Sequence, residues 1–204
     1  MGVKERRERQ KLETRDGILA AARKIAREDG WGAVTIRRVA EMIEYSPPII
    51  YEYFASKDAL IGDLQRISFD LLADTMRASG EGISDPAERM AQMGRAYWRF
   101  AHESPELYQV MHGWDSASVP MENTLVGARK SAAIVREVLE DWARAEGVTL
   151  QDAQGAVETL WALLHGLITV EMLDRVGGGP ERAEGLAVQA LQDLLFAWRS
   201  RGGQ

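Results

Sequence analysis

The pattern of apolar and polar positions along the chain is helical almost throughout. Apolar residues recur every three or four positions, and no sustained apolar/polar alternation of the kind that marks a strand occurs. The pattern therefore predicts an all-α protein of about nine helices. The expected helices span residues 14–29, 36–43, 47–54, 57–79, 86–103, 105–113, 120–146, 149–176 and 181–199.

The boundaries of these helices are indicated by hydroxyl residues, prolines and glycines. Serine or threonine is favoured as an N-cap, and proline is favoured at the first helical position. Asp85, Pro86 and Glu88 combine a cap, a proline and a carboxylate that can return to the cap. Gly30 and Gly32 flank Trp31 and end the first helix. The other expected caps are Thr35, Ser46, Ser56 and Ser104.

Composition excludes several classes of protein. The chain has 204 residues, 46% of them apolar and 27% charged, as expected of a globular protein with a substantial core. It has no cysteine, so disulfides, thiol catalysis and cysteine-ligated metals are excluded. No secretory signal is found, and the longest mostly apolar stretch, Leu160 to Leu173, is too short to span a membrane. A cytoplasmic location and no membrane partner are expected.

Charge is distributed unevenly along the chain. Residues 1–54 hold 11 Lys/Arg and 9 Asp/Glu, a net charge of +2, whereas the remainder has a net charge of −8 and the whole chain −6. A polyanion is therefore expected to meet the N-terminal part.

The segment from Thr35 to Lys57 carries the most information about function. Its two short helices and three-residue turn predict a helix-turn-helix, whose second helix enters the DNA major groove. The stretches Thr35-Ile36-Arg37-Arg38-Val39-Ala40, Tyr45-Ser46 and Ile50-Tyr51-Glu52-Tyr53-Phe54-Ala55-Ser56-Lys57-Asp58-Ala59-Leu60 resemble the tetracycline-repressor (TetR) family of transcriptional regulators. The close resemblance covers about Thr14 to Leu64, and the rest of the chain is similar in layout.

The resemblance and the residue types together predict how DNA is contacted. Arg37 matches a family position that reaches a base edge, where a bidentate pair with guanine is the expected chemistry. Hydroxyl groups and Lys57 are expected to bind phosphates. Arg38 and Tyr53 have structural alternatives, as a solvated charge and a core residue. The expected DNA-contacting residues are Thr35, Arg37, Arg38, Ser46, Pro47, Pro48, Ile49, Tyr51, Tyr53 and Lys57.

The chain departs from the family pattern in two places. Glu44 occupies the turn position usually held by glycine, which normally supplies a positive φ there. The recognition helix opens with Pro47, Pro48 and Ile49, which offer few hydrogen bonds to base edges. Apolar contact with thymine methyl groups is therefore expected to carry part of the readout.

The arm from Lys4 to Lys11 has two interpretations. Its basic residues are suited to a minor groove or to phosphates. Its interleaved glutamates are equally compatible with a disordered or frayed helical tail.

The C-terminal part is rich in aromatic residues, including Tyr97, Phe100 and Trp114, and it holds all three histidines. Apolar pockets between helices, with a few polar groups, are common ligand sites; the alternative is that these aromatics fill the core or a subunit interface. Few fixed charges accompany them, so the expected effector is apolar, aromatic or weakly cationic. The expected ligand-binding residues are Trp98, His102, Tyr108, His112, Trp142, Trp161 and His165.

No catalytic, metal or cofactor site is predicted, because nucleophile-elbow, Walker and H-E-x-x-H motifs are missing from the sequence. The expected domains are residues 1–56, a three-helix DNA-binding domain, and residues 57–204, a helical bundle for effector binding and dimerisation. The resemblance implies a homodimer that a small-molecule effector releases from a palindromic double-stranded DNA operator. The alternative is an all-α ligand-binding or interaction protein that has lost operator binding. The expected dimer contacts are Val157, Leu160, Trp161, Leu164, Leu167, Ile168, Leu191, Leu195 and Trp198.

Overall fold

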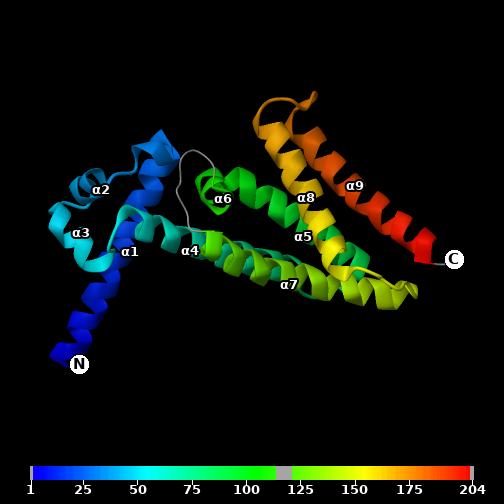
Figure 1. Cartoon of the computed structure of the whole chain (residues 1–204), viewed down its shortest axis with the longest axis horizontal. Helices are drawn as coiled ribbons and strands as arrows, with labels where there is room; N and C mark the ends of the chain where they lie inside the picture. Colours follow the sequence, from blue (N-terminus) through cyan, green and yellow to red (C-terminus); the bar gives the residue numbers. More distant parts are fainter. Residues whose placement is uncertain (1, 114–120, 203–204) are drawn as a thin grey trace. The chain divides into compact units, whose positions relative to one another are not determined.

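The computed structural model describes residues 2–113 and 121–202, and over these ranges it has nine α-helices, one short 3₁₀ helix and no strand. The predicted all-α class and helix number are confirmed. The structure divides into two compact units: residues 1–68 with 104–127, and residues 69–103 with 128–204. The helices are α1 (Val3–Asp29), η1 (Trp31–Ala33), α2 (Ile36–Met42), α3 (Pro47–Tyr53), α4 (Lys57–Ser79), α5 (Pro86–Glu103), α6 (Pro105–Met111), α7 (Met121–Glu146), α8 (Ala153–Met172) and α9 (Gly179–Gly202) (Figure 1).

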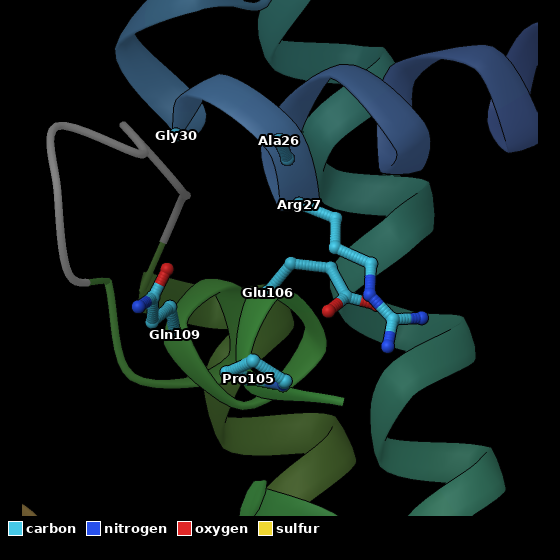
Figure 2. Close-up of a pocket in the computed structure, with 6 residues that line it drawn as sticks. All are labelled: Ala26, Arg27, Gly30, Pro105, Glu106 and Gln109. Atoms are coloured by element: carbon cyan, nitrogen blue, oxygen red, sulfur yellow. The ribbon is translucent and has the colours of Figure 1, made fainter. Parts of the chain in front are cut away.

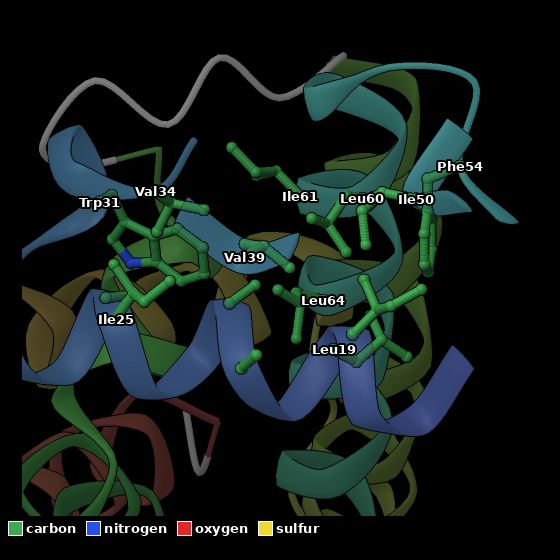
Figure 3. Close-up of a cluster of buried hydrophobic side chains, with 14 of the residues drawn as sticks. Leu19, Ile25, Trp31, Val34, Val39, Ile50, Phe54, Leu60, Ile61 and Leu64 are labelled. Carbon is green, nitrogen blue, oxygen red and sulfur yellow. The ribbon is translucent and has the colours of Figure 1, made fainter. Parts of the chain in front are cut away.

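The first unit is organised around the buried side of α1. Ile18, Ala22 and Ile25 recur at helical spacing, are fully buried, and pack in one apolar cluster with side chains of the following helices. Figure 3 shows this cluster, in which Val39 of α2, Ile50 of α3 and the α4 leucines converge on α1. The helix-turn-helix is therefore held by α1 and α4 together. The cluster also includes Trp31, Val34, Phe54, Leu60, Ile61, Leu64 and Val110.

The first unit includes α6 and the start of α4 as well as the helix-turn-helix. The first turns of α4 contribute to the same core as α1, and α6 packs on α1. The side-chain amide of Gln65 is fully buried and donates to the backbone carbonyls of Val110 and Met111, at 3.4 and 3.3 Å. Residues 57–68 and 104–113 therefore group with the helix-turn-helix, and the division into functional domains at residue 56 stays a prediction.

The second unit is a bundle in which α5, α8 and α9 pack on one another. Gly94 of α5 permits a close approach to α9, since a methyl group there would lie 2.5 Å from Leu191 Cδ1. Of the expected dimer contacts, only Trp161 is exposed, and Leu167 and Trp198 are partly buried. The others are buried in the unit's own core, so their assignment to a subunit interface is wrong: Val157, Leu160, Leu164, Ile168, Leu191 and Leu195.

Several predicted helix ends are confirmed and others are corrected. Thr35 and Ser56 cap their helices as expected, accepting from Arg38 N–H and Ala59 N–H. Ser46 and Ser104 precede their helices but make no side-chain capping bond. Asp85 accepts from Ala87 N–H at 3.0 Å, whereas the side chain of Glu88 does not return to the cap and accepts from Gln92.

The largest differences in helix length concern α1 and α8. The helix α1 begins at Val3 rather than Thr14, because the polar residues before the apolar stripe are themselves good helix formers. The helix α8 spans Ala153–Met172 rather than 149–176, because Asp152 caps it by accepting from Gly155 N–H at 2.8 Å. The predicted start of α7 at Pro120 lies outside the described residues. In addition, α6 ends at Met111 rather than 113, and α9 extends over Gly179–Gly202 rather than 181–199.

The turn between α2 and α3 is left-handed at Glu44, whose φ is +58°. Tyr45 N–H donates to Ala40 O at 2.9 Å across this turn. A side chain with a Cβ is strained in this region by about 1–2 kcal/mol, a cost that glycine does not have. The expectation that this position requires a positive φ is confirmed.

Replacing Glu44 with glycine is expected to stabilise the protein. The relief of the left-handed strain exceeds the entropic cost of glycine, so Glu44→Gly should raise the free energy of unfolding by about 1 kcal/mol in urea denaturation. Glu44→Ala is the matched control, because it removes the carboxylate but keeps the Cβ. Equal stability of the two variants would contradict this account of the turn.

Candidate nucleic-acid interface and effector site

The predicted DNA-contacting residues form the accessible surface of the helix-turn-helix. None of the ten is buried. The fully buried side chains of α2 and α3 are Val39, Ala40 and Ile50, and Tyr53, one of the ten, packs against the same core cluster. The motif therefore presents one apolar side to the core and the other to solvent, as a DNA-binding helix pair requires. Six are exposed (Thr35, Arg37, Ser46, Pro47, Pro48 and Tyr51) and four are partly buried (Arg38, Ile49, Tyr53 and Lys57).

The two arginines of the motif are paired with carboxylates. Arg37 Nε donates to Glu41 Oε1 at 2.8 Å, and this bond raises the pKa of the already basic guanidinium. The Arg37 side chain is 84% exposed, so the pair is solvated and a base edge can compete for the arginine. Arg38 pairs with Asp29 at the end of α1. Arg38 can therefore serve as a structural residue that pairs with Asp29 instead of contacting DNA, whereas Arg37 remains accessible.

The recognition helix α3 has an apolar outer surface. Pro47 and Pro48 are exposed and lack backbone N–H groups. Tyr51 is 54% exposed on the next turn, and Glu52 supplies the one charge of the helix. This surface is suited to contact with thymine methyl groups and to a few hydrogen bonds from the tyrosine, rather than to many base-edge pairs.

A polar connection between α1 and α6 was not anticipated from the sequence. The side chain of Glu106 is 1% exposed, and its Oε1 accepts from Arg23 Nε at 2.7 Å. The indole Nε1 of Trp31 donates to Glu106 O at 2.9 Å, and Arg23 also reaches Ser104 Oγ. The other carboxylate oxygen of Glu106 has no hydrogen-bond partner among the residues that the structure describes. A glutamate in a short helix gives no sequence signal of burial, so only the packing of α6 on α1 reveals this connection.

A small pocket adjoins this connection. It is lined by Ala26, Arg27, Gly30, Pro105, Glu106 and Gln109, and its volume is about 240 Å³ (Figure 2). Pockets for drug-sized ligands usually have volumes of about 300–1,000 Å³. The pocket is therefore small for such a ligand.

The predicted ligand-binding residues divide between the two units. Tyr108 and His112 lie in the first unit, where their rings meet edge to face at 4.6 Å, and Tyr108 is fully buried. Trp98, His102, Trp142, Trp161 and His165 lie in the second unit. Trp114 lies outside the described residues.

His102 of α5 and Glu171 of α8 form a polar pair in the second unit. His102 Nε2 is 2.7 Å from Glu171 Oε2, and His102 Nδ1 is 2.9 Å from Trp98 O. Both ring nitrogens thus face oxygen acceptors, whereas a neutral imidazole has one N–H. Glu171 is not predicted from the sequence, because α5 and α8 are far apart in the chain.

Each histidine of this unit stacks on a tryptophan ring. Trp98 stacks on His102 at 4.9 Å, and Trp161 stacks on His165 at 5.1 Å. Burial lowers the pKa of His165 and so favours its neutral form. Trp142 is buried, and its ring centroid lies 6.5 Å from that of Trp198. This is the position expected of Trp142 if the aromatic residues fill the core instead of binding a ligand.

Residues 2–113 and 121–202 contain no group of three or more acidic, histidine or cysteine side chains placed to hold a metal ion. None of their helices is long and apolar enough to cross a membrane.

The fold and the exposed helix pair define a helix-turn-helix DNA-binding protein. Residues 18–64 match the profile described as bacterial regulatory proteins, tetR family, and residues 90–194 match the tetracyclin repressor-like C-terminal domain. The chain belongs to the TetR family of transcriptional regulators.

Known proteins resemble the chain at modest identity. It is 31% identical over 85 residues to the HTH-type transcriptional regulator HbdR of Aromatoleum sp., covering 42% of this chain and only 37% of that relative. It is 26% identical over 160 residues to the uncharacterized HTH-type transcriptional regulator Rv0681 of Mycobacterium tuberculosis, covering 78% and 70% of the two chains. A solved structure of a protein with unknown function from Rhodococcus sp. RHA1 shares the fold, with a TM-score of 0.78 and 22% identity over 91% of this chain and 95% of that one.

Proposed function

We propose that this TetR-family regulator is a repressor that binds a near-palindromic operator as a homodimer and leaves it when a small apolar, aromatic or weakly cationic effector binds. The observation that carries the proposal is the accessibility of the helix-turn-helix surface, with Arg37 exposed at the start of α2 and the outer side of α3 free of core contacts. For release, the effector must bind more tightly to a dimer conformation whose two DNA-binding heads have the wrong spacing for the operator than to the conformation that binds DNA.

A second candidate is an all-α ligand-binding or interaction protein that no longer binds an operator. The observation that favours it is the acidic character of the motif, in which Glu41, Glu44 and Glu52 are exposed and both arginines are paired. A gel shift on the DNA upstream of the protein's own gene separates the two candidates. A specific complex supports the repressor, and failure to distinguish that duplex from a scrambled one supports the second candidate.

Arg37 is expected to read one base pair in each half-site. Because a bidentate contact with guanine is specific, Arg37→Ala should weaken operator binding by about 1–3 kcal/mol and relax the base preference at one position per half-site. Lys57→Ala serves as the comparison, since loss of a phosphate contact should weaken all sequences alike and reduce the salt dependence. The measurement is selection of bound sequences from a randomised duplex pool. An unchanged preferred sequence for Arg37→Ala would refute this role.

The proposed dimer surface consists of the apolar side chains that α8 and α9 leave exposed. Phe196 is 63% exposed and Trp161 48%, and Val170, Leu173 and Leu186 are also exposed. Exposed apolar side chains on two adjacent helices are suited to an isologous four-helix contact with a second copy.

Sedimentation velocity at micromolar concentration tests this surface. The protein is expected to sediment as a dimer, and Phe196→Glu should shift it towards the monomer by burying a charge in the contact. Leu12→Glu is the matched control, because Leu12 is 62% exposed but lies on α1. A monomeric wild-type protein, or equal effects of the two substitutions, would contradict the proposal.

The proposed effector site is the aromatic and histidine cluster of the second unit. The stacked rings of Trp98 and His102 offer an apolar surface, and the Glu171 carboxylate beside them favours a donor or cationic group over an anion. These features support the effector class expected from the sequence.

Intrinsic tryptophan fluorescence tests the effector class. Aromatic and lipophilic-cation compounds are expected to change the fluorescence and to release DNA in a gel shift, whereas anionic compounds are not. His102→Phe should weaken this response while keeping the ring stack on Trp98. Tight binding and DNA release by multiply charged anions alone would overturn this assignment.

A further inference from the structure

The first turns of α1 form a helix that stands clear of the rest of its unit. Residues 4–13 are all exposed, and Figure 1 shows this part of α1 projecting past α3. Local hydrogen bonds stabilise this part of the helix. Gly2 N–H donates to Glu5 Oε2 at 2.9 Å, and Thr14 Oγ1 donates to Gln10 O. The segment that the sequence left as either an arm or a tail is thus an ordered helical extension of the DNA-binding head.

One side of this extension continues the buried side of α1. Lys11 and Lys4 precede the fully buried Ile18 by seven and fourteen residues, and Ile25 follows it by seven. Residues spaced by seven lie on nearly the same side of a helix, with a drift of about 20° per seven residues. Arg7, three residues after Lys4, lies on this side as well. The side of α1 that packs on the helix-turn-helix therefore becomes cationic where it runs past the core.

The remaining cations of the first unit are largely neutralised. Arg15 pairs with Asp63, Arg23 with Glu106, and Lys24 with Glu28. Arg37 pairs with Glu41, and Arg38 with Asp29. Arg9 pairs with Glu13, and Arg66 with Asp63. Among the described residues of this unit, the lysines and arginines outside ion pairs are Lys4, Arg6, Arg7, Lys11, Arg27 and Lys57. Most of the uncompensated positive charge thus lies on the extension.

The three cations on this side of α1 are neighbours along the free helix. Lys4 and Arg7 are three residues apart, and Arg7 and Lys11 are four apart, so like charges adjoin along one side. Glu8, four residues after Lys4 and three before Lys11, offsets part of this repulsion. A polyanion that covers this side would remove the repulsion and add charge-assisted hydrogen bonds.

We infer that the face formed by Lys4, Arg7 and Lys11, here called the extension face, binds the phosphate backbone of the DNA duplex that the helix-turn-helix reads. This inference rests on the proposed DNA-binding function and adds to it a source of affinity that carries no sequence information. The apolar α3 selects the sequence, and the extension face supplies the electrostatic attraction that the paired arginines of the motif do not.

Two double variants with equal charge change test the extension face. Arg7→Gln/Lys11→Gln removes two cations from the face, and Arg6→Gln/Arg9→Gln removes two from other sides of the same helix. Fluorescence anisotropy measures binding of each full-length variant to the duplex upstream of the protein's own gene and to a scrambled duplex, over a salt series. Circular dichroism checks that each variant keeps its helix content, which glutamine favours.

The expected result is an asymmetry between the two variants. Arg7→Gln/Lys11→Gln should weaken binding to both duplexes by about tenfold or more, and it should reduce the slope of log K against log salt by about 1.8, or 0.9 for each lost phosphate contact. The ratio of the affinities for the two duplexes should stay unchanged. Arg6→Gln/Arg9→Gln should change the slope much less. Equal slopes for the two variants, or no change in either, would overturn the inference.

The wild-type protein and a lipid control distinguish the remaining outcomes. A wild type that selects the upstream duplex while Arg7→Gln/Lys11→Gln keeps its slope retains the proposed function and refutes the extension face. A wild type that binds neither duplex at low salt refutes both. Sedimentation with vesicles of equal phosphatidylglycerol and phosphatidylcholine is expected to leave the protein in solution. Vesicle binding that requires Arg7 and Lys11, without a change in DNA binding, would assign the face to a membrane and overturn the inference.

Discussion

The packing of α1 against the helices that follow it is the constraint on which the DNA-binding head depends. Helices as short as α2 and α3, of seven residues each, are marginal in isolation, so their position comes from burial of Val39 and Ile50 against Ile18 and Ile25. Trp31 and Gln65 extend the same core to α6 through buried donors to backbone carbonyls. The outer surface of the motif can vary because the inner surface fixes its geometry.

The turn between α2 and α3 shows how much strain this core tolerates. Glu44 is held in the left-handed region by the backbone bond from Tyr45 to Ala40. A residue with a Cβ persists there because packing on both sides determines the turn. The surface chemistry of α3 is separate from this constraint, since Pro47, Pro48 and Tyr51 point outward. The proposed readout of DNA and the stability of the turn thus depend on different residues of the same short helices.

The sequence predicts the helices well where periodicity and local chemistry agree. The spacing of Ile36, Val39 and Ala40, the cap at Thr35 and the left-handed turn at Glu44 all depend on near neighbours, and each agrees with the structure. The length of α1 was underestimated, because the apolar stripe stops at Ile18 while the helix continues through charged residues of high helix propensity.

The sequence does not predict contacts between helices that are distant in the chain, because these contacts depend on which helix sides meet. Val157 and Leu160 lie on an apolar helix, and the pattern does not say whether they face α5 and α9 or a second subunit. Glu171 and Glu106 are ordinary glutamates until folding places them beside His102 and Arg23. The ligand-binding prediction grouped Tyr108 with Trp98 because both are aromatic, yet the two belong to different compact units.

In the proposed binding mode, the ion pairs of the first unit separate two kinds of contact with DNA. Electrostatic attraction to phosphates is strong, depends on salt and is the same for every sequence, whereas contacts to base edges and methyl groups discriminate. Pairing Arg38 with Asp29 and Arg37 with Glu41 reduces the first contribution at the motif itself. A wrong sequence then gains little from the motif, because no excess charge compensates for poor apolar contacts at α3. Attraction placed on a separate helix raises the affinity for all sequences equally, so it speeds encounter without altering the ratio that defines specificity.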